Sequence, residues 1–216
     1  MSSRISMNRT IVLSRAFFAR STLQTARELL GKVLVHSTAA GTAAGVIVEV
    51  EAYVGEDDPA CHAAAGLTCR NSPLYGPPGR AYVYLNYGLH CLMNAVTESV
   101  GYPAAVLIRA LEPCEGIELM RTRRLVGKSR SADSMANDAL CRGPGNVTSA
   151  LGITLEQNRL DLSGNRLFIE DRGDRVSSLV WSQRIGIRSG LDRHWRGFVR
   201  DSRSVSGSRQ TIESLR

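Results

Sequence analysis

Residues 48–66 have the sequence "VEVEAYVGEDDPACHAAAG", in which a Val-rich run carries two carboxylates. The apolar character of this run predicts a buried strand over residues 45–54. Side chains alternate between the two faces of a strand, so Glu49, Glu51 and Tyr53 share one face. A buried charge is costly unless it is paired or used in chemistry. We therefore expect these two carboxylates to have partners.

The segments around this strand complete the pattern of an α+β fold. Helical spacing of apolar residues predicts a helix over 22–30, which Gly31 ends, and a strand that begins at Lys32. The other predicted elements are a loop over 55–80, a hairpin over 80–98, a strand over 104–113, a helix over 115–126, a short helix after a Gly-rich turn at 143–146, and short strands with Arg-rich loops from 166 onward. This order predicts a single α+β domain over residues 1–216 with a mixed sheet.

The composition is ordinary for a soluble globular protein, with 43% hydrophobic and 22% charged residues. No apolar run reaches the length of a membrane span. The N-terminus also lacks the apolar core of a signal peptide. We therefore expect a cytoplasmic protein that has no membrane partner.

The net charge of +7 favours a polyanionic partner. Residues 121–130 carry five cations and no acid, and residues 184–203 carry six Arg against two Asp. Such runs are usually solvated faces, and a phosphate-binding surface is the alternative. Lys32 and Lys128 are the only lysines, so the basic character comes almost entirely from Arg.

The five cysteines argue against a disulfide framework or a zinc ribbon, because their number is odd and no pair has CxxC spacing. A metal-dependent hydrolase could use Cys61, His62, Cys69, His90 and Cys91, but adjacent Cys-His pairs are poor joint ligands. Free buried cysteines and no bound metal are the expectation.

Six polar or aromatic residues interrupt or follow strands that should pair in one sheet. They are Glu51, Tyr53, His62, Tyr84, Asn94 and Arg109. Tyrosine faces stack on planar rings, and amide and imidazole groups bind ring edges, so the set predicts a pocket for a flat, polar, aromatic ligand. An Arg beside Glu51 would keep it ionised, as a general base requires. The alternative is that Arg109 forms a structural ion pair with either Glu49 or Glu51.

Four ordered motifs extend this pattern: "VEVEAYVGEDDPACHAAAG", "TCRNSPLYGPPGRAYVYLNYGLHCLMNAV", "AAVLIRALEP" and "RGPGNVTSALGI". The set resembles the alkyladenine (3-methyladenine) DNA glycosylase family of the mammalian type, which also has bacterial members. The resemblance runs in order over residues 12–206. It implies a curved, mainly antiparallel sheet flanked by helices, like that of a formyltransferase C-terminal domain.

The resemblance implies an enzyme of base excision repair. It would hydrolyse the N-glycosidic bond of damaged purines in double-stranded DNA and leave an abasic site. The implied substrates are 3-methyladenine, 7-methylguanine, ethenoadenine and hypoxanthine. Glu51 matches the general base that activates the attacking water, and Arg109 helps to hold that water. A main-chain carbonyl near Ile185 matches the third ligand of the water, and Glu49 is expected to support its neighbour. No cofactor or metal is implied, and no lysine near the motifs would support strand cleavage.

A base inside a duplex must be flipped out to be reached. The resemblance assigns Tyr87 to the gap left in the base stack, with Leu89 and His90 against the adjoining bases. Tyr53 and Tyr84 are assigned to the two faces of the flipped base, His62 to its edge, and Asn94 to exclusion of the amine of guanine. Further DNA contacts are assigned to Thr68, Arg70, Gly143 and Gly145. An ordinary helix start is the alternative for the two glycines.

The chain also departs from the family pattern. Cys69 stands where a Pro is common, and the Ala-rich loop between His62 and Thr68 is one residue shorter than in animal members. Residues 207–216 match no motif and are expected to form a disordered tail. The competing hypothesis is a lesion-binding protein without catalysis, against which the presence of both Glu51 and Arg109 argues. A monomer is expected because a glycosylase acts on one lesion at a time.

Overall fold

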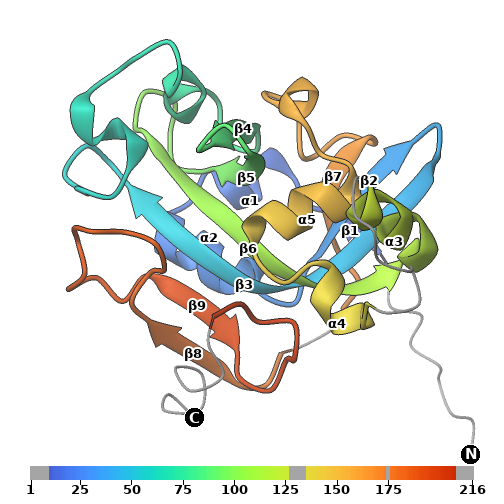
Figure 1. Cartoon of the computed structure of the whole chain (residues 1–216). Coiled ribbons are helices and arrows are strands. Elements are labelled where there is room, and N and C mark those ends of the chain that lie inside the picture. Colours follow the sequence, from blue (N-terminus) through green and yellow to red (C-terminus); the bar gives the residue numbers. More distant parts are fainter. Residues whose placement is uncertain (1–9, 127–134, 174–175, 208–216) are drawn as a thin grey trace, which may run out of the picture.

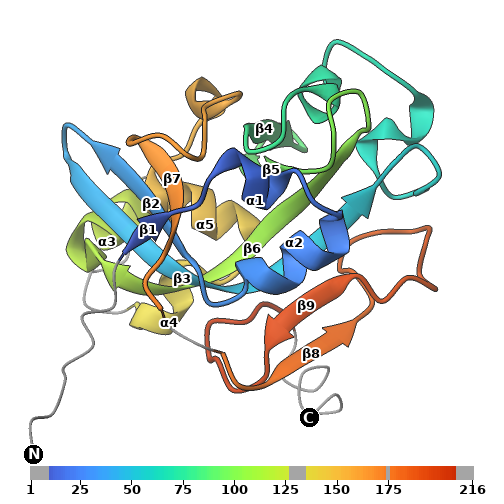
Figure 2. The same cartoon turned by 180° about the vertical axis from the view of Figure 1, so that it is seen from behind.

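One antiparallel sheet organises the molecule (Figures 1 and 2). The computed structural model describes residues 10–126, 135–173 and 176–207. The described strands are β1 (Ile11–Val12), β2 (Val33–Thr38), β3 (Gly41–Val54), β4 (Ala81–Asn86), β5 (His90–Val96), β6 (Ala104–Glu115), β7 (Leu167–Asp171), β8 (Leu179–Ser182) and β9 (Arg196–Val199). They follow the order β1-β7-β2-β3-β6-β5-β4, and β9 pairs with both β3 and β8. Every pairing among these strands is antiparallel, which confirms the α+β class and the mainly antiparallel sheet that the resemblance implies. The mixed sheet predicted from the order of the elements is wrong for the described strands.

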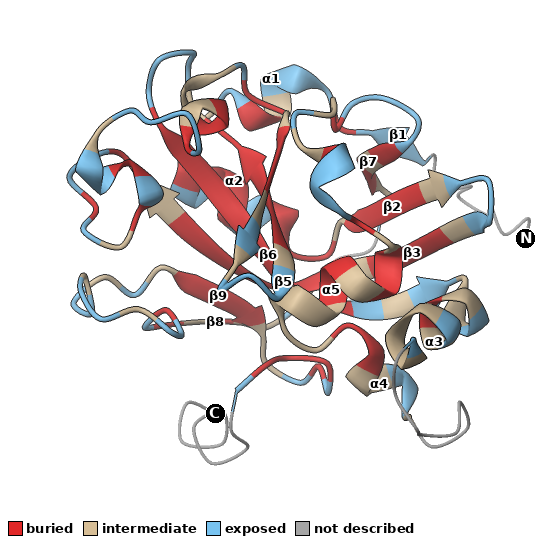
Figure 3. Cartoon of the chain, turned by 45° about the horizontal axis from the view of Figure 1, so that its top comes forward, coloured by how far each residue is buried: buried red, intermediate tan, exposed pale blue. Residues whose placement is uncertain are grey.

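Helices cover both faces of the sheet (Figures 1 and 2). The described helices are α1 (Arg15–Phe18), α2 (Thr22–Leu29), α3 (Ile117–Leu125), α4 (Asn137–Leu140) and α5 (Pro144–Leu151), with 3-10 turns at His62–Ala65, Ser72–Tyr75 and Leu155–Gln157. On one face α2 packs against β3 and β6, and on the other α5 packs against β5 and β6. Buried Leu29 of α2 and Leu151 of α5 contribute to the main apolar core. The sheet therefore lies buried between two layers (Figure 3).

The central strand, β3, carries the two carboxylates that stand out in the sequence. β2 pairs with its first half, β9 pairs with residues 49–51, and β6 runs along the opposite edge. All residues from 47 to 52 are buried. A strand covered on both faces has a continuous apolar sequence, which explains the run from Ala43 to Val48; Glu49 and Glu51 are the buried charged exceptions.

A β-bulge interrupts the pairing of β3 with β6 next to Glu49. Glu49 lies opposite Ala110 and Val50 lies opposite Ile108, so the register passes over Arg109. A bulge of this kind redirects a side chain and is common beside active sites. It places Arg109 within reach of both Glu49 and Glu51.

Two predicted boundaries near Pro113 are wrong by a few residues. β6 continues through Pro113 to Glu115, and α3 begins at Ile117. Pro cannot donate to a strand ladder, but the register shift between Ala44 and Gly45 accommodates it. The short elements β1, α1 and α4 stand out in no sequence pattern, because each has at most four residues.

Among the described helices, none is long and apolar enough to cross a membrane. Of the predicted tail over residues 207–216, only Gly207 belongs to the described residues.

Candidate active site

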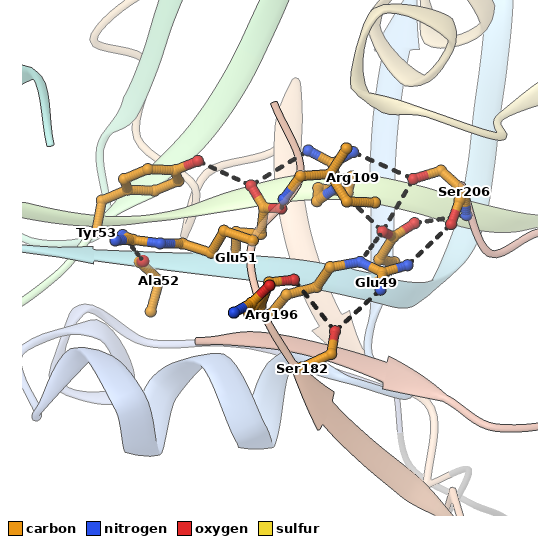
Figure 4. Close-up of polar contacts among 11 residues, drawn as sticks. Glu49, Glu51, Ala52, Tyr53, Arg109, Ser182, Arg196 and Ser206 are labelled. Carbon is orange, nitrogen blue, oxygen red and sulfur yellow. Dashed lines mark hydrogen bonds and ion pairs between the residues drawn. The ribbon is translucent and has the colours of Figure 1, made fainter. Parts of the chain in front are cut away.

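Two buried carboxylates and two arginines form the centre of the candidate site (Figure 4). Arg109 donates from Nε to Glu49 Oε1 at 3.0 Å and from Nη1 to Glu51 Oε2 at 3.2 Å. Arg196 on β9 donates from Nε to Glu49 Oε1 at 2.6 Å. The two positive and two negative charges balance, which offsets the cost of burying them.

Glu51 is held by three donors. Tyr53 Oη donates to Oε2 at 2.8 Å, the main-chain N–H of Ile185 donates to Oε1 at 2.7 Å, and Arg109 supplies the third. A carboxylate has about four acceptor positions. One position on Glu51 therefore remains for a further donor such as water.

Glu49 is more fully engaged than Glu51. Besides the two arginines, it accepts hydrogen bonds from the Ser206 main-chain N–H at 2.7 Å and from Ser206 Oγ at 2.9 Å. Arg109 Nη2 also donates to Ser206 Oγ at 3.2 Å, and Arg196 Nη2 donates to the Ser206 carbonyl at 2.8 Å. Glu49 thus accepts four hydrogen bonds, which fill its acceptor positions.

The electrostatic environment keeps Arg109 charged and Tyr53 protonated. Burial alone would lower the pKa of Arg109, but the charges of Glu51 and Glu49 outweigh it and raise that pKa. Burial and the neighbouring Glu51 carboxylate both raise the pKa of Tyr53. Each side chain is therefore a hydrogen-bond donor to Glu51 at neutral pH.

A cavity of about 400 Å³ opens beside this cluster. Its lining combines aromatic, apolar and amide side chains: Tyr53, Ala60, Cys61, His62, Leu74, Tyr82, Tyr84, Asn86, Tyr87, Leu92, Asn94, Ala105, Leu107, Arg109, Pro144, Ile185, Gly186 and Ile187. Tyr53, Arg109 and Ile185 both line the cavity and contact Glu51. The carboxylate therefore lies directly behind the cavity wall.

One wall of the cavity consists of aromatic rings that pack against one another. His62 contacts Tyr84 edge to face, with the ring centroids 4.5 Å apart, and His62 Nδ1 lies 2.9 Å from Tyr82 Oη. Burial and the nearby Arg70 lower the pKa of His62, so its imidazole is neutral at neutral pH. Burial also raises the pKa of Tyr82 to about 12. The wall is uncharged and has polar edges.

Asn94 lies on β5 with Tyr82 as its neighbour across the hairpin. Its Nδ2 donates to the Tyr82 carbonyl at 3.1 Å, and its side chain lies on the cavity wall. The predicted pocket residues Tyr53, His62, Tyr84 and Asn94 thus lie around one cavity, together with Arg109.

The tip of the β4–β5 hairpin projects into solvent at the cavity mouth. Tyr87 is 88% exposed and Leu89 is 76% exposed. Tyr87 also lines the cavity. Tyr87 and Gly88 have φ angles of 49° and 71°, so the tight turn forces an aromatic residue into the left-handed region. Large exposed apolar groups at a cavity mouth mark a contact surface.

The Gly-rich turn before α5 lies against this hairpin. A Cβ at Gly145 would lie 3.1 Å from the His90 side chain, so a larger residue there would require His90 to shift. Thr148 of α5 also donates to the Cys91 carbonyl at 2.6 Å. This packing gives Gly145 a structural role whether or not the turn binds DNA.

Asn71 organises the loop that carries Thr68 and Arg70. Asn71 accepts from the Thr68 N–H at 2.7 Å and donates to the carbonyls of His62 and Gly66 at 2.9 and 2.8 Å. Arg70 Nη2 donates to the Leu85 carbonyl at 2.9 Å, which ties this loop to the hairpin. Arg70 therefore lies beside the hairpin, and Thr68 lies in the same loop.

Four further buried residues belong to this region although the sequence patterns assign them no role. They are Asp58, Arg184, Arg196 and Ser206. Arg184 and Arg196 sit in the Arg-rich segment, which resembles a solvated face. Arg196 adjoins the apolar residues of β9, where an unpaired charge would be costly, so its position indicates a buried partner. No comparable signal marks Arg184, which follows β8.

Cys61 and Cys141 are free and buried as expected, and Cys91 is half-buried. Cys69 and Cys114 are exposed, which corrects the expectation for these two. Cys69 lies at the turn before Asn71, where the loop faces solvent. In the described residues, no group of three or more His, Cys, Asp or Glu side chains is placed to hold a metal ion.

The comparison with known families agrees with this geometry. A family model described as "Methylpurine-DNA glycosylase (MPG)" matches residues 16–203. The chain belongs to the methylpurine-DNA glycosylase family. This confirms the resemblance and the expected class of enzyme, a DNA glycosylase of the 3-methyladenine type.

Relatives of the methylpurine-DNA glycosylase family span nearly the whole chain. A protein of Chlorobium phaeobacteroides named "Putative 3-methyladenine DNA glycosylase" is 48% identical over 91% of this chain and 96% of its own length. Proteins of the same name from Methanocella arvoryzae and Rubrobacter xylanophilus are 47% and 48% identical over 90% and 88% of this chain. The matched regions cover 96% and 95% of the lengths of these two proteins.

Proposed function

We propose that this protein is a monofunctional DNA glycosylase that removes alkylated or deaminated purines from double-stranded DNA. The observation that carries the proposal is the position of Glu51. It lies behind the wall of an aromatic cavity with three donors and one open acceptor position. The volume of about 400 Å³ is in the range of small-ligand sites.

In the proposed reaction, Glu51 accepts a proton from a water molecule as the water oxygen attacks C1′ of the damaged nucleotide. The N-glycosidic bond breaks, its electron pair leaves with the base, and an abasic site remains. Arg109 and the Ile185 carbonyl would hold the water. The Ile185 N–H donates to Glu51, so the residue whose carbonyl would hold the water adjoins the proposed base.

The ring-lined cavity suits a purine that has been flipped from the duplex. Tyr53 and Tyr84 would stack on its faces, with His62 at its edge. Asn94 would exclude the exocyclic amine of guanine by crowding it. The proposed substrates are 3-methyladenine, 7-methylguanine, ethenoadenine and hypoxanthine.

The exposed hairpin tip provides the element that stabilises a flipped nucleotide. Tyr87 would fill the gap in the base stack, and Leu89 and His90 would press on the adjoining bases. Thr68, Arg70, Gly143 and Gly145 would contact the backbone around the lesion. The proposed partner is duplex DNA, bound by a monomer without metal or cofactor.

Base release from short duplexes tests this function. Each duplex carries one of the four lesions, EDTA is present throughout, and products are analysed before and after alkali. We expect release of the base with strand breaks only after alkali. Tight lesion binding without release from any duplex would instead support the lesion-binding alternative.

A further inference from the structure

A buried cation lies against the pocket ring of Tyr53. Arg184 precedes the cavity-lining Ile185, and its guanidinium carbon is 4.7 Å from the centroid of the Tyr53 ring. The same carbon is 5.3 Å from the ring of Trp195. Arg184 is 3% exposed and does not line the cavity, whereas Tyr53 does. The cation therefore meets the tyrosine from behind the cavity wall.

An ion pair fixes this guanidinium. Arg184 Nη1 and Nη2 donate to the two carboxylate oxygens of Asp58 at 2.6 and 2.8 Å, and Nη1 also donates to the Ala52 carbonyl at 2.9 Å. Asp58 accepts main-chain N–H groups from Val54 and Ala60 as well. This bidentate geometry holds the guanidinium plane in one orientation.

The charge at this position persists at all ordinary pH values. Burial alone would lower the pKa of Arg184, but the hydrogen bonds and charge of Asp58 outweigh it and raise the pKa. The other charged groups facing the pair are Arg193, whose Nη1 is 3.6 Å from Asp58, and Glu51 at the hydroxyl end of Tyr53.

An aromatic ring attracts cations at its electron-rich faces. A cation already placed at one face draws electron density toward itself and repels a second cation at the opposite face. A neutral aromatic ring stacked there escapes that repulsion. N3- and N7-alkylated purines are cations, whereas hypoxanthine and ethenoadenine are not.

We propose that Arg184, held between Tyr53 and Trp195 by Asp58, biases the pocket toward uncharged damaged purines. The inference rests on the proposed function, and it makes Arg184 a specificity-determining residue that acts through Tyr53. Arg184 contacts neither the base nor the water.

The test is the ratio of single-turnover excision rates for 7-methylguanine and hypoxanthine in one duplex context. The double variant Arg184→Met with Asp58→Asn removes both charges and leaves neither partner ionised. We expect the ratio to shift several-fold toward the cationic base, whatever happens to the two absolute rates. Arg184→Lys keeps a cation and should hold the ratio near the wild-type value.

A purely structural role would slow both reactions by the same factor, so an unchanged ratio in the double variant would overturn the inference. If that variant does not fold, the ratio of excision rates is measured for Asp58→Asn alone. It leaves the Arg184 cation uncompensated and should shift the ratio toward hypoxanthine. Failure of the wild type to release either base would instead refute the proposed function, and this inference with it.

Discussion

At the scale of single residues, Tyr53 connects the cavity to the carboxylate. Its ring lines the cavity, and its hydroxyl donates to Glu51 Oε2 at 2.8 Å. The stacking surface and the donor are separate parts of one side chain. They can therefore be tested separately.

Tyr53→Phe removes the donor and keeps the ring. We expect the free energy of unfolding to fall by about 1.5–3 kcal/mol, as for a hydrogen bond to a charged group. Affinity for a lesion duplex should stay near the wild-type value, because the ring remains. Urea unfolding and duplex titration measure the two effects. Unchanged stability with lost affinity would contradict this division of roles.

Tyr87→Ala tests the exposed hairpin tip. Because Tyr87 is 88% exposed, its loss should leave thermal stability nearly unchanged. Affinity for a lesion duplex should fall at least about tenfold, since an apolar or aromatic plug stabilises the unstacked site. Ile11→Ala is the matched control: Ile11 is 57% exposed on β1, at the opposite end of the strand order. Equal affinities of the two variants would show that Tyr87 does not stabilise the unstacked site.

At the scale of elements, the segment after β9 closes the carboxylate cluster. Ser206 contributes its main-chain N–H, its carbonyl and its hydroxyl to Glu49, Arg196 and Arg109. A segment near the end of the chain thus supports groups on β3, β6 and β9. Its contribution is measurable by truncation.

Deletion of residues 206–216 should destabilise the protein strongly relative to deletion of residues 208–216, because only the first removes Ser206. We expect the difference to exceed the loss in Ser206→Ala, about 1–3 kcal/mol, since the main-chain contacts are lost as well. Urea unfolding of the three variants provides the comparison. Equal stabilities of the two deletions would show that Ser206 contributes nothing.

The sequence predicts long elements better than short or irregular ones. The apolar runs of β3 and β6 and the alternation of β4 and β5 are strong local signals, and these strands lie where expected. The bulge at Arg109 depends on pairing between strands about 60 residues apart, which no local pattern contains. The motifs single out the cavity residues, whereas Arg184 and Ser206 reach the site only through tertiary packing.

At the scale of the whole molecule, a buried histidine makes stability depend on pH. Burial lowers the pKa of His36 below the ordinary value of 6.5. His36 is buried against the Leu151 carbonyl, with its Nδ1 2.8 Å away. Below pH 6.5 the unfolded chain binds protons that the folded chain does not. The free energy of unfolding should therefore be highest above this pH, as far as this histidine determines it, and should fall as the pH decreases.

His36→Gln should make this dependence shallower between about pH 7 and pH 5. Urea unfolding across that window measures the slope, and it stays above the range in which carboxylates such as Asp58 titrate. His194→Gln is the control, because His194 is exposed. A slope identical to that of the wild type would show that His36 does not contribute.

The central claim is that Glu51 activates the water, and single-turnover excision by Glu51→Gln tests it most directly. Glu170→Gln is the matched control, because Glu170 is also a buried, ion-paired carboxylate, on β7. On the duplex from which the wild type releases the base fastest, Glu51→Gln should lose about 10²–10⁴-fold in rate while still binding the lesion, and Glu170→Gln should keep its rate. Excision by Glu51→Gln at the wild-type rate would contradict the account.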